Sequence, residues 1–188
     1  MALRPLYDGL AYQPAEDSYL LLRHVERLVW GLVLDMGTGS GIQALGAASR
    51  VEVERVVAVD IDPKAVRDAD RNLREAGLRH RVELLIADLF SALRPLGLFN
   101  WIVFNPPYLP SEGAVDEPSW AGGPRGGEVI ERFLREASSY LRDEGGILLV
   151  YSTLTGLDGD VFMGYRVEVL EVLPLFYERL LCVCLRPS

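Results

Sequence analysis

Short apolar runs alternate with amphipathic stretches along most of the chain. In the first amphipathic stretch, residues 15–29, leucine, valine and histidine side chains recur at three- and four-residue spacing, which predicts a helix. Strand-like runs that alternate with helices are typical of an α/β fold with a mainly parallel sheet. The predicted strands are residues 32–35, 56–61, 82–87, 101–104, 146–152, 165–173 and 178–185, and the predicted helices are residues 15–29, 41–49, 63–76 and 128–141.

The last two predicted strands are joined by a short turn near Pro174, which indicates an antiparallel hairpin at the end of the sheet. No internal repeat or linker divides the 188 residues, so a single domain is expected. Within it, residues 1–30 are predicted to form an N-terminal helix and cofactor lid, and residues 31–188 a Rossmann-like core with helices on both faces of a seven-stranded sheet. The Pro- and Gly-rich segment 105–127 is longer than an ordinary connection, which favours a functional loop.

Composition narrows the classes of protein that fit. No apolar run is long enough to span a membrane, and residues 1–9 lack the features of a secretory signal, so a cytoplasmic protein is expected. Cys182 and Cys184 would lie on the same face of a strand and are expected to be buried and reduced, and no metal site is predicted. The net charge of −8 and the lack of a basic stripe argue against direct binding of nucleic acid.

A glycine-rich turn follows the first predicted strand. It reads Asp35-Met36-Gly37-Thr38-Gly39-Ser40-Gly41, a spacing that departs from the dinucleotide fingerprint, because Ile42 stands where that fingerprint requires glycine. Glycines let the backbone approach a ligand closely, although a plain tight turn would also use them. The acid before the glycines disfavours an anionic pyrophosphate. It favours a ligand with a cationic amino group, such as the methionine part of S-adenosylmethionine.

Two further acids end predicted strands. Asp60 closes the second strand, where a carboxylate can accept hydrogen bonds from both hydroxyls of a ribose. Helix capping would be the alternative role, but Asp62 is better placed for it. Asp88 closes the third strand, where it could accept from an adenine amino group while Leu89 or Ile61 packs against the ring; a simple loop acid is the alternative.

The fourth predicted strand runs directly into Asn105-Pro106-Pro107-Tyr108. Two consecutive prolines fix the backbone in an extended shape, so the Asn105 side chain is held at the carboxyl edge of the sheet. The Asn105 and Pro106 carbonyl oxygens can together accept both hydrogens of a planar NH2 group and orient its nitrogen for methyl transfer. The Tyr108 ring can stack on the same flat group. These three residues are the predicted catalytic residues.

The sequence resembles a family of amino-methyltransferases in three segments. The N-P-P-Y motif is shared by glutamine-N5 methyltransferases of release factors (the HemK type) and by adenine-N6 methyltransferases. Residues 14–22, P-A-E-D-S-Y-L-L-L, and residues 120–129, W-A-G-G-P-R-G-G-E-V, resemble the short eukaryotic and archaeal HemK-like branch. The resemblance implies a class I, Rossmann-like, S-adenosylmethionine-dependent methyltransferase. Carried over from the family, the cofactor-binding residues are Ser18, Asp35, Gly37, Asp60, Asp88, Leu89 and Asn105. Gly39 of the glycine turn and Ile61 after the second strand complete the predicted cofactor-binding set.

The resemblance also implies an acceptor and a partner. The implied acceptor is the glutamine of the Gly-Gly-Gln loop in a class I peptide-chain release factor, and the implied partner is a small zinc-binding activator protein in a heterodimer. Adenine-N6 methylation of RNA or DNA stays open as the alternative, and a binding module without turnover is a third hypothesis. The chain departs from the family in two respects: the N-terminal helical domain of bacterial HemK is not found, and residues 154–164 are too short and glycine-rich for the usual helix.

Overall fold

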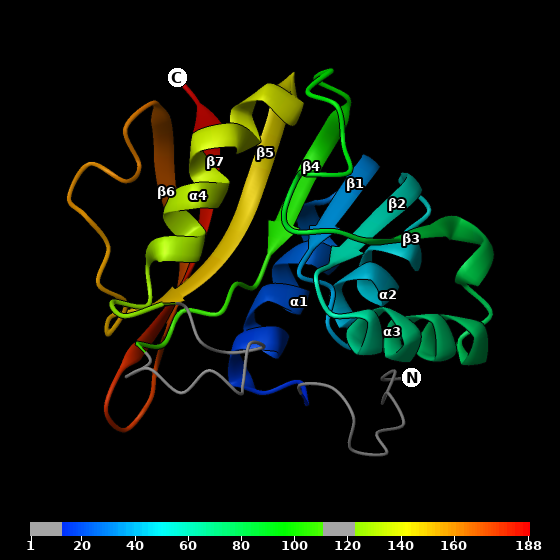
Figure 1. Cartoon of the computed structure of the whole chain (residues 1–188), viewed down its shortest axis with the longest axis horizontal. Coiled ribbons are helices and arrows are strands. Elements are labelled where there is room, and N and C mark those ends of the chain that lie inside the picture. Colours follow the sequence, from blue (N-terminus) through cyan, green and yellow to red (C-terminus); the bar gives the residue numbers. More distant parts are fainter. Residues whose placement is uncertain (1–12, 111–122) are drawn as a thin grey trace.

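The computed structural model describes residues 13–110 and 123–188 and contains one seven-stranded sheet in the order β3-β2-β1-β4-β5-β7-β6 (Figure 1). Strands β1 to β5 are parallel, and β7 runs antiparallel between β5 and β6. The strands are β1 Gly31–Met36, β2 Val53–Asp60, β3 Val82–Ile86, β4 Phe99–Phe104, β5 Leu141–Ser152, β6 Tyr165–Pro174 and β7 Arg179–Pro187; the α-helices are α1 Glu16–Leu28, α2 Ile42–Ala48, α3 Pro63–Glu75 and α4 Glu128–Ala137.

The predicted α/β fold with its C-terminal hairpin is confirmed, and the differences lie at the ends of elements. Helix α4 ends at Ala137, and a 3-10 turn, Ser138–Tyr140, leads into β5. Strand β5 begins at Leu141, earlier than residue 146, because Leu141 pairs with Phe99 of β4 across an irregularity in the register. Residues 153–164 form turns without a helix, as their glycine-broken pattern indicated.

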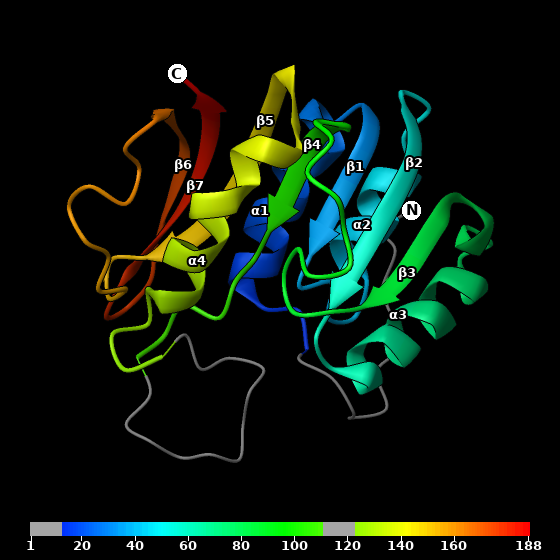
Figure 2. The same cartoon turned by 45° about the horizontal axis from the view of Figure 1, so that its top comes forward.

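Apolar side chains alternate between the two faces of the sheet and create two cores. On β1, Val33 joins the core beneath α1, α2 and α3, whereas Leu34 and Met36 join the core beneath α4. This alternation follows from the two-residue period of a strand. Figure 2 shows α4 in front of the sheet and α1 and α2 behind it. Cys182 and Cys184 of β7 are buried and unpaired on the face covered by α1, as predicted.

The order of the strands fixes where a ligand can bind. Strands β1 and β4 are neighbours in the sheet, although β2 and β3 lie between them in the sequence. Ligands of open α/β sheets bind at such a switch point, beyond the carboxyl ends of the strands. The glycine turn follows β1, Asp60 is the last residue of β2, and Asn105 follows β4. The fold therefore brings all three to this one edge. Within the described ranges, no helix is long and apolar enough to cross a membrane.

Candidate active site

The glycine turn lies against the residues that follow β4. Gly37 has a φ of 64°, a left-handed conformation that favours glycine, and a Cβ added there would lie 3.2 Å from Cε2 of Phe104. Gly41, with a φ of 82°, approaches α3 so closely that an added Cβ would lie 3.1 Å from the Cβ of Ala69. The turn therefore needs glycine for both its backbone shape and its close packing.

Asp35 lies beneath this turn and holds it in place. Its Oδ2 accepts hydrogen bonds from Thr38 Oγ1 at 2.6 Å and from the Ala44 amide at 3.0 Å. Burial of the carboxyl group raises the pKa of Asp35 to about 7. A ligand ammonium beside this carboxyl would favour its charged form. Thr38 was not among the predicted site residues, because its contact with Asp35 appears only once the turn is folded.

Asp60 connects the ends of β1 and β2. Its Oδ2 accepts from the Gly39 amide at 2.8 Å, and its Oδ1 accepts from the Asp62 amide at 2.9 Å. Because a carboxylate oxygen has two lone pairs, each oxygen can still accept one ribose hydroxyl. Partial burial raises the pKa of Asp60. Asp62 accepts from the Lys64 amide and caps α3, which confirms the role predicted for it.

The residues after β3 lie at the same edge. The Asp88 carboxylate is half exposed and accepts from Arg132 of α4 at 2.7 Å, a partner that the sequence did not indicate. Leu89 is buried with a φ of 46°, a rare conformation for a leucine, and such strain often marks a functional position. Ile61, beyond β2, is 60% exposed and therefore available for packing against a ligand.

Asn105 stands at the end of β4 with its amide orientation fixed by two groups of α1. Its Nδ2 donates to Asp17 Oδ2 at 3.2 Å and lies 3.4 Å from Ser18 Oγ. Its Oδ1 is buried and has no hydrogen-bond partner within residues 13–110 and 123–188. A buried carbonyl oxygen without a donor is costly unless a ligand completes it. The site therefore offers one oriented acceptor to an incoming NH group.

Asp17 is a site residue that the sequence reading passed over. It accepts from the Tyr108 hydroxyl at 3.1 Å, from the Asn105 amide and, through Oδ1, from the Ser18 amide at 2.6 Å. Through these bonds the carboxylate joins α1 to both ends of the Asn-Pro-Pro-Tyr segment. Asp17 is only 4% exposed, so the hydrogen bonds are largely shielded from water. Asp17 belongs to the P-A-E-D-S segment that the sequence analysis singled out. Its role is revealed only by its hydrogen bond with Asn105, which lies 88 positions away in the sequence.

The segment after β5 supports the Tyr108 backbone. Thr155 Oγ1 donates to the Tyr108 carbonyl oxygen at 3.1 Å, and Gly126, with a φ of 82°, packs directly on that oxygen. The Gly156 amide donates to the Arg125 carbonyl oxygen at 2.8 Å. Residues 153–164, which form no helix, thus brace the backbone after the Asn-Pro-Pro-Tyr segment.

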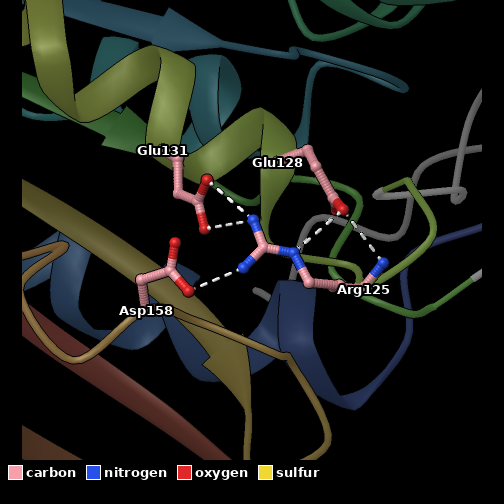
Figure 3. A network of polar contacts seen from close by, with 4 residues as sticks. All are labelled: Arg125, Glu128, Glu131 and Asp158. Atoms are coloured by element: carbon pink, nitrogen blue, oxygen red, sulfur yellow. Dashed lines mark hydrogen bonds and ion pairs between the residues drawn. The ribbon is translucent and has the colours of Figure 1, made fainter.

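A network of ion pairs around Arg125 holds residues 153–164 against α4 (Figure 3). The guanidinium binds Asp158 Oδ1 at 2.7 Å and both carboxylate oxygens of Glu131, and it contacts Glu128 as well. These acids come from α4 and from the segment after β5, so a single side chain joins the two. Of the W-A-G-G-P-R-G-G-E-V segment, residues 120–122 lie outside the described residues.

The donor set fits S-adenosylmethionine. A buried carboxyl group lies under a close-packed glycine turn, a second carboxylate ends β2, and the unpartnered Asn105 oxygen lies beside them at the switch point. In the described part of the chain no cluster of His, Cys, Asp or Glu is arranged to hold a metal ion. Fold and site together define a class I, S-adenosylmethionine-dependent methyltransferase.

Comparison with known proteins places the chain in a family. The methyltransferase small domain family matches residues 14–163, and the chain belongs to that family. It is 32% identical over 181 residues to a putative protein N5-glutamine methyltransferase of Methanocaldococcus jannaschii, covering 92% of this chain and 89% of the relative. It is 35% identical to methyltransferase HEMK2 of Mus musculus, covering 74% of this chain and 70% of the relative.

Other relatives are longer, and one solved structure is similar along the whole chain. The release factor glutamine methyltransferase of Rhodopirellula baltica is 38% identical, but the chain spans only 53% of its length. The E. cuniculi Mtq2-Trm112 complex, described as responsible for methylating the eRF1 translation termination factor, contains a chain that is 27% identical. The match has a TM-score of 0.73 and covers 94% of this chain and 98% of that one.

Proposed function

We propose that this methyltransferase modifies the side-chain amide nitrogen (N5) of a glutamine, within the Gly-Gly-Gln motif of a class I peptide-chain release factor. The observation that carries the proposal is the buried Asn105 Oδ1, which has no partner in the described residues while the Nδ2 of the same amide is held by Asp17. An amide NH2 is a flat double donor, and it complements this acceptor together with the Pro106 carbonyl oxygen.

The chain's own residues position and stabilise the acceptor nitrogen. S-adenosylmethionine supplies an electrophilic methyl group on a sulfonium. The two carbonyl oxygens hold both N–H bonds, so that the nitrogen lone pair points toward the methyl carbon. As the N–C bond forms and the C–S bond breaks, positive charge develops on the nitrogen and the same oxygens stabilise it. After methyl transfer the nitrogen loses one proton to water. The Tyr108 ring packs on the flat amide and helps to hold it in place.

The proposed cofactor contacts come from the strand ends and from the start of α1. Ser18, Asp35, Gly37 and Gly39 surround the methionine part, and the half-buried carboxylate of Asp60 accepts the ribose hydroxyls. Asp88 accepts from the adenine amino group while Ile61 and Leu89 flank the ring. Residues 1–30 are proposed to cover the cofactor, although α1 within them also packs on the core, and residues 31–188 form the rest of the domain; residues 1–12 and 111–122 lie outside the described part.

A glutamine acceptor fits the chain better than adenine. The archaeal relative is named for N5-glutamine methylation of protein, and the bacterial relatives are named for glutamine methylation of release factors or of ribosomal protein uL3, so the names share a protein glutamine as acceptor. The net charge of −8 also disfavours the phosphate contacts that a nucleic-acid substrate requires. The similarity to the Mtq2-Trm112 complex supports a small partner protein. We propose that this partner binds zinc and that the heterodimer acts in the cytoplasm.

The test uses a radiolabelled methyl group. The full chain with its small partner is incubated with labelled S-adenosylmethionine and a release factor, either unchanged or with Gln→Ala in the Gly-Gly-Gln motif. The expected result is label on the unchanged protein alone, and loss of that label in the Asn105→Ala enzyme. Label that persists on the Gln→Ala protein refutes the glutamine assignment, and label on RNA or DNA in its place supports the adenine alternative.

A further inference from the structure

Two aromatic side chains are exposed at the tip of the hairpin between β6 and β7. Phe176 is 90% exposed and Tyr177 is 86% exposed, and their rings form an edge-to-face pair with centroids 4.6 Å apart. The turn is closed by a hydrogen bond from the Leu175 amide to the Glu178 carbonyl oxygen at 2.8 Å. Adjacent exposed aromatic residues on a closed turn are a feature of binding surfaces more than of plain connections.

The tip lies at the same edge of the sheet as the active site. Because β7 runs antiparallel to β5 and Leu180 pairs with Ser152, the turn before β7 lies beside the carboxyl end of β5 (Figure 1). Two hydrogen bonds between Thr153 and Arg179, at 2.9 and 3.0 Å, fasten it there, and the Ser152 hydroxyl donates to Glu178. The aromatic pair is therefore presented on a fixed support.

A hollow of about 430 Å³ lies between the start of α1 and the end of β6, next to this tip. Tyr19, which is 42% exposed, lines it and directly follows the site residue Ser18. The lining residues are Pro14, Ala15, Glu16, Tyr19, Arg23 and Leu173. Tyr19, Leu173, Phe176 and Tyr177 together are called the rim surface below: Tyr19 and Leu173 line the hollow, and Phe176 and Tyr177 lie on the turn that directly follows β6.

We infer that the rim surface docks the acceptor protein itself, through apolar side chains that flank its glutamine loop. The inference rests on the proposed function and adds how the enzyme distinguishes a folded acceptor from any accessible glutamine. Strands β4 and β7 are separated by β5, about 10 Å across the sheet. Asn105 follows Phe104, which pairs with Leu149, so it lies level with Cys182 of β7, and the Phe176 tip extends about 20 Å further along the strand direction. About seven residues of extended chain cover this separation, so a folded acceptor with its glutamine at Asn105 reaches the rim surface through the surface around its glutamine loop.

The charges around the rim surface favour a protein occupant over nucleic acid. Exposed aromatic rings can stack on bases, but binding a strand also requires cations along its backbone. Arg23 is engaged by Glu171 at 2.7 Å, and Glu16 and Glu178 add negative charge close by. The aromatic pair with a neighbouring hollow instead resembles the anchor of a protein interface, in which a few aromatic residues supply most of the affinity.

The test separates docking from chemistry. The enzyme with Phe176→Ser and Tyr177→Ser is compared with a matched control carrying Val51→Ser and Leu96→Ser, two exposed apolar residues that precede β2 and β4 at the opposite edge of the sheet. With an intact release factor, the rim variant is expected to raise KM by about tenfold or more with little change in kcat. The control and the conservative pair Phe176→Leu with Tyr177→Phe keep the KM of the unchanged enzyme. The dissociation constant for S-adenosylhomocysteine stays the same in all four.

Each outcome is decisive. A KM of the rim variant equal to that of the control, with methylation intact, overturns the docking surface and leaves the proposed function standing. Loss of cofactor binding in the rim variant overturns it as well, because it would show a structural role. If the unchanged enzyme labels no release factor at all, the proposed function fails and the docked partner fails with it. Labelled RNA whose KM rises in the rim variant assigns the surface to nucleic acid instead.

Discussion

Replacing Asp17 by asparagine tests how the acceptor site is oriented. The Asp17 carboxylate accepts from Asn105 Nδ2 at 3.2 Å and from the Tyr108 hydroxyl at 3.1 Å. An asparagine at position 17 keeps the shape but brings one NH2 group into this set. Where the new NH2 group faces the NH2 group of Asn105, two donors oppose each other. The Asn105 side chain is then expected to flip its amide. Its NH2 would then occupy the position of the Oδ1 that we propose accepts the substrate.

The expected magnitude follows from losing one oriented acceptor. Such a loss raises the barrier by about 2–4 kcal/mol, which corresponds to a decrease in kcat of about 30- to 900-fold. The free energy of unfolding should fall by only about 1–3 kcal/mol, the cost of disturbing buried hydrogen bonds. The affinity for S-adenosylhomocysteine should be largely retained, because Asn105 acts on the acceptor.

A double-mutant cycle measures whether Asp17 acts through Asn105. Single-turnover methyl transfer is recorded for Asp17→Asn, Asn105→Ala and the double variant, with thermal unfolding and cofactor affinity measured on each. If Asp17 orients Asn105, the double variant is about as slow as Asn105→Ala alone, because coupled residues are not additive. Additive losses, or a kcat unchanged by Asp17→Asn, would contradict the orienting role.

Three other perturbations probe the rest of the site. Asp60→Ala should weaken cofactor binding by about 1.5–3 kcal/mol, the scale of a charged acceptor; an unchanged dissociation constant in calorimetry would remove Asp60 from the cofactor site. Burial raises the pKa of Asp35 from 3.8 to about 7, so the folded, cofactor-free chain holds a proton that the unfolded chain releases. The stability that Asp35 contributes is therefore fully present below pH 4 and falls by about 4 kcal/mol as the pH rises through 7. Denaturant unfolding at several pH values should show this fall in the free energy of unfolding for the unchanged chain, and the Asp35→Asn variant should not show it. Arg125→Ala should lower kcat about tenfold by loosening the Tyr108 loop, with cofactor affinity and melting temperature nearly unchanged; a change in cofactor affinity alone would argue against the brace.

Sequence reasoning succeeded where a residue's role is set by its immediate neighbours. The prolines after Asn105 restrict their own backbone and the glycines after Asp35 permit a tight turn, so the position of both segments at the carboxyl edge could be predicted before any contact was known. The cap by Asp62 and the final hairpin were equally local. Such features depend on a few consecutive residues and on the order of the strands.

The rest could not be predicted, because it depends on contacts between distant segments. Asp17 meets Asn105 across 88 positions, and Arg132 meets Asp88 across 44. The support of Tyr108 by Thr155 also required the tertiary arrangement, since residues 154–164 showed only that a helix was absent. Burial was equally hidden, and it is burial that raises the pKa of Asp35.

Helix α1 has a consequence for how the enzyme matures during synthesis. It carries Asp17 near its start, and it packs on β5 and β7 while Arg23 and His24 hold Glu171 of β6. Helix α1 packs on the nearby α2, but part of its support comes from strands that are synthesised much later. A nascent chain that has already formed β1 to β4 has its glycine turn and its Asn-Pro corner, yet it lacks β5 and β7, on which α1 packs. We therefore expect methyl transfer to require the strands β5 and β7 that support α1.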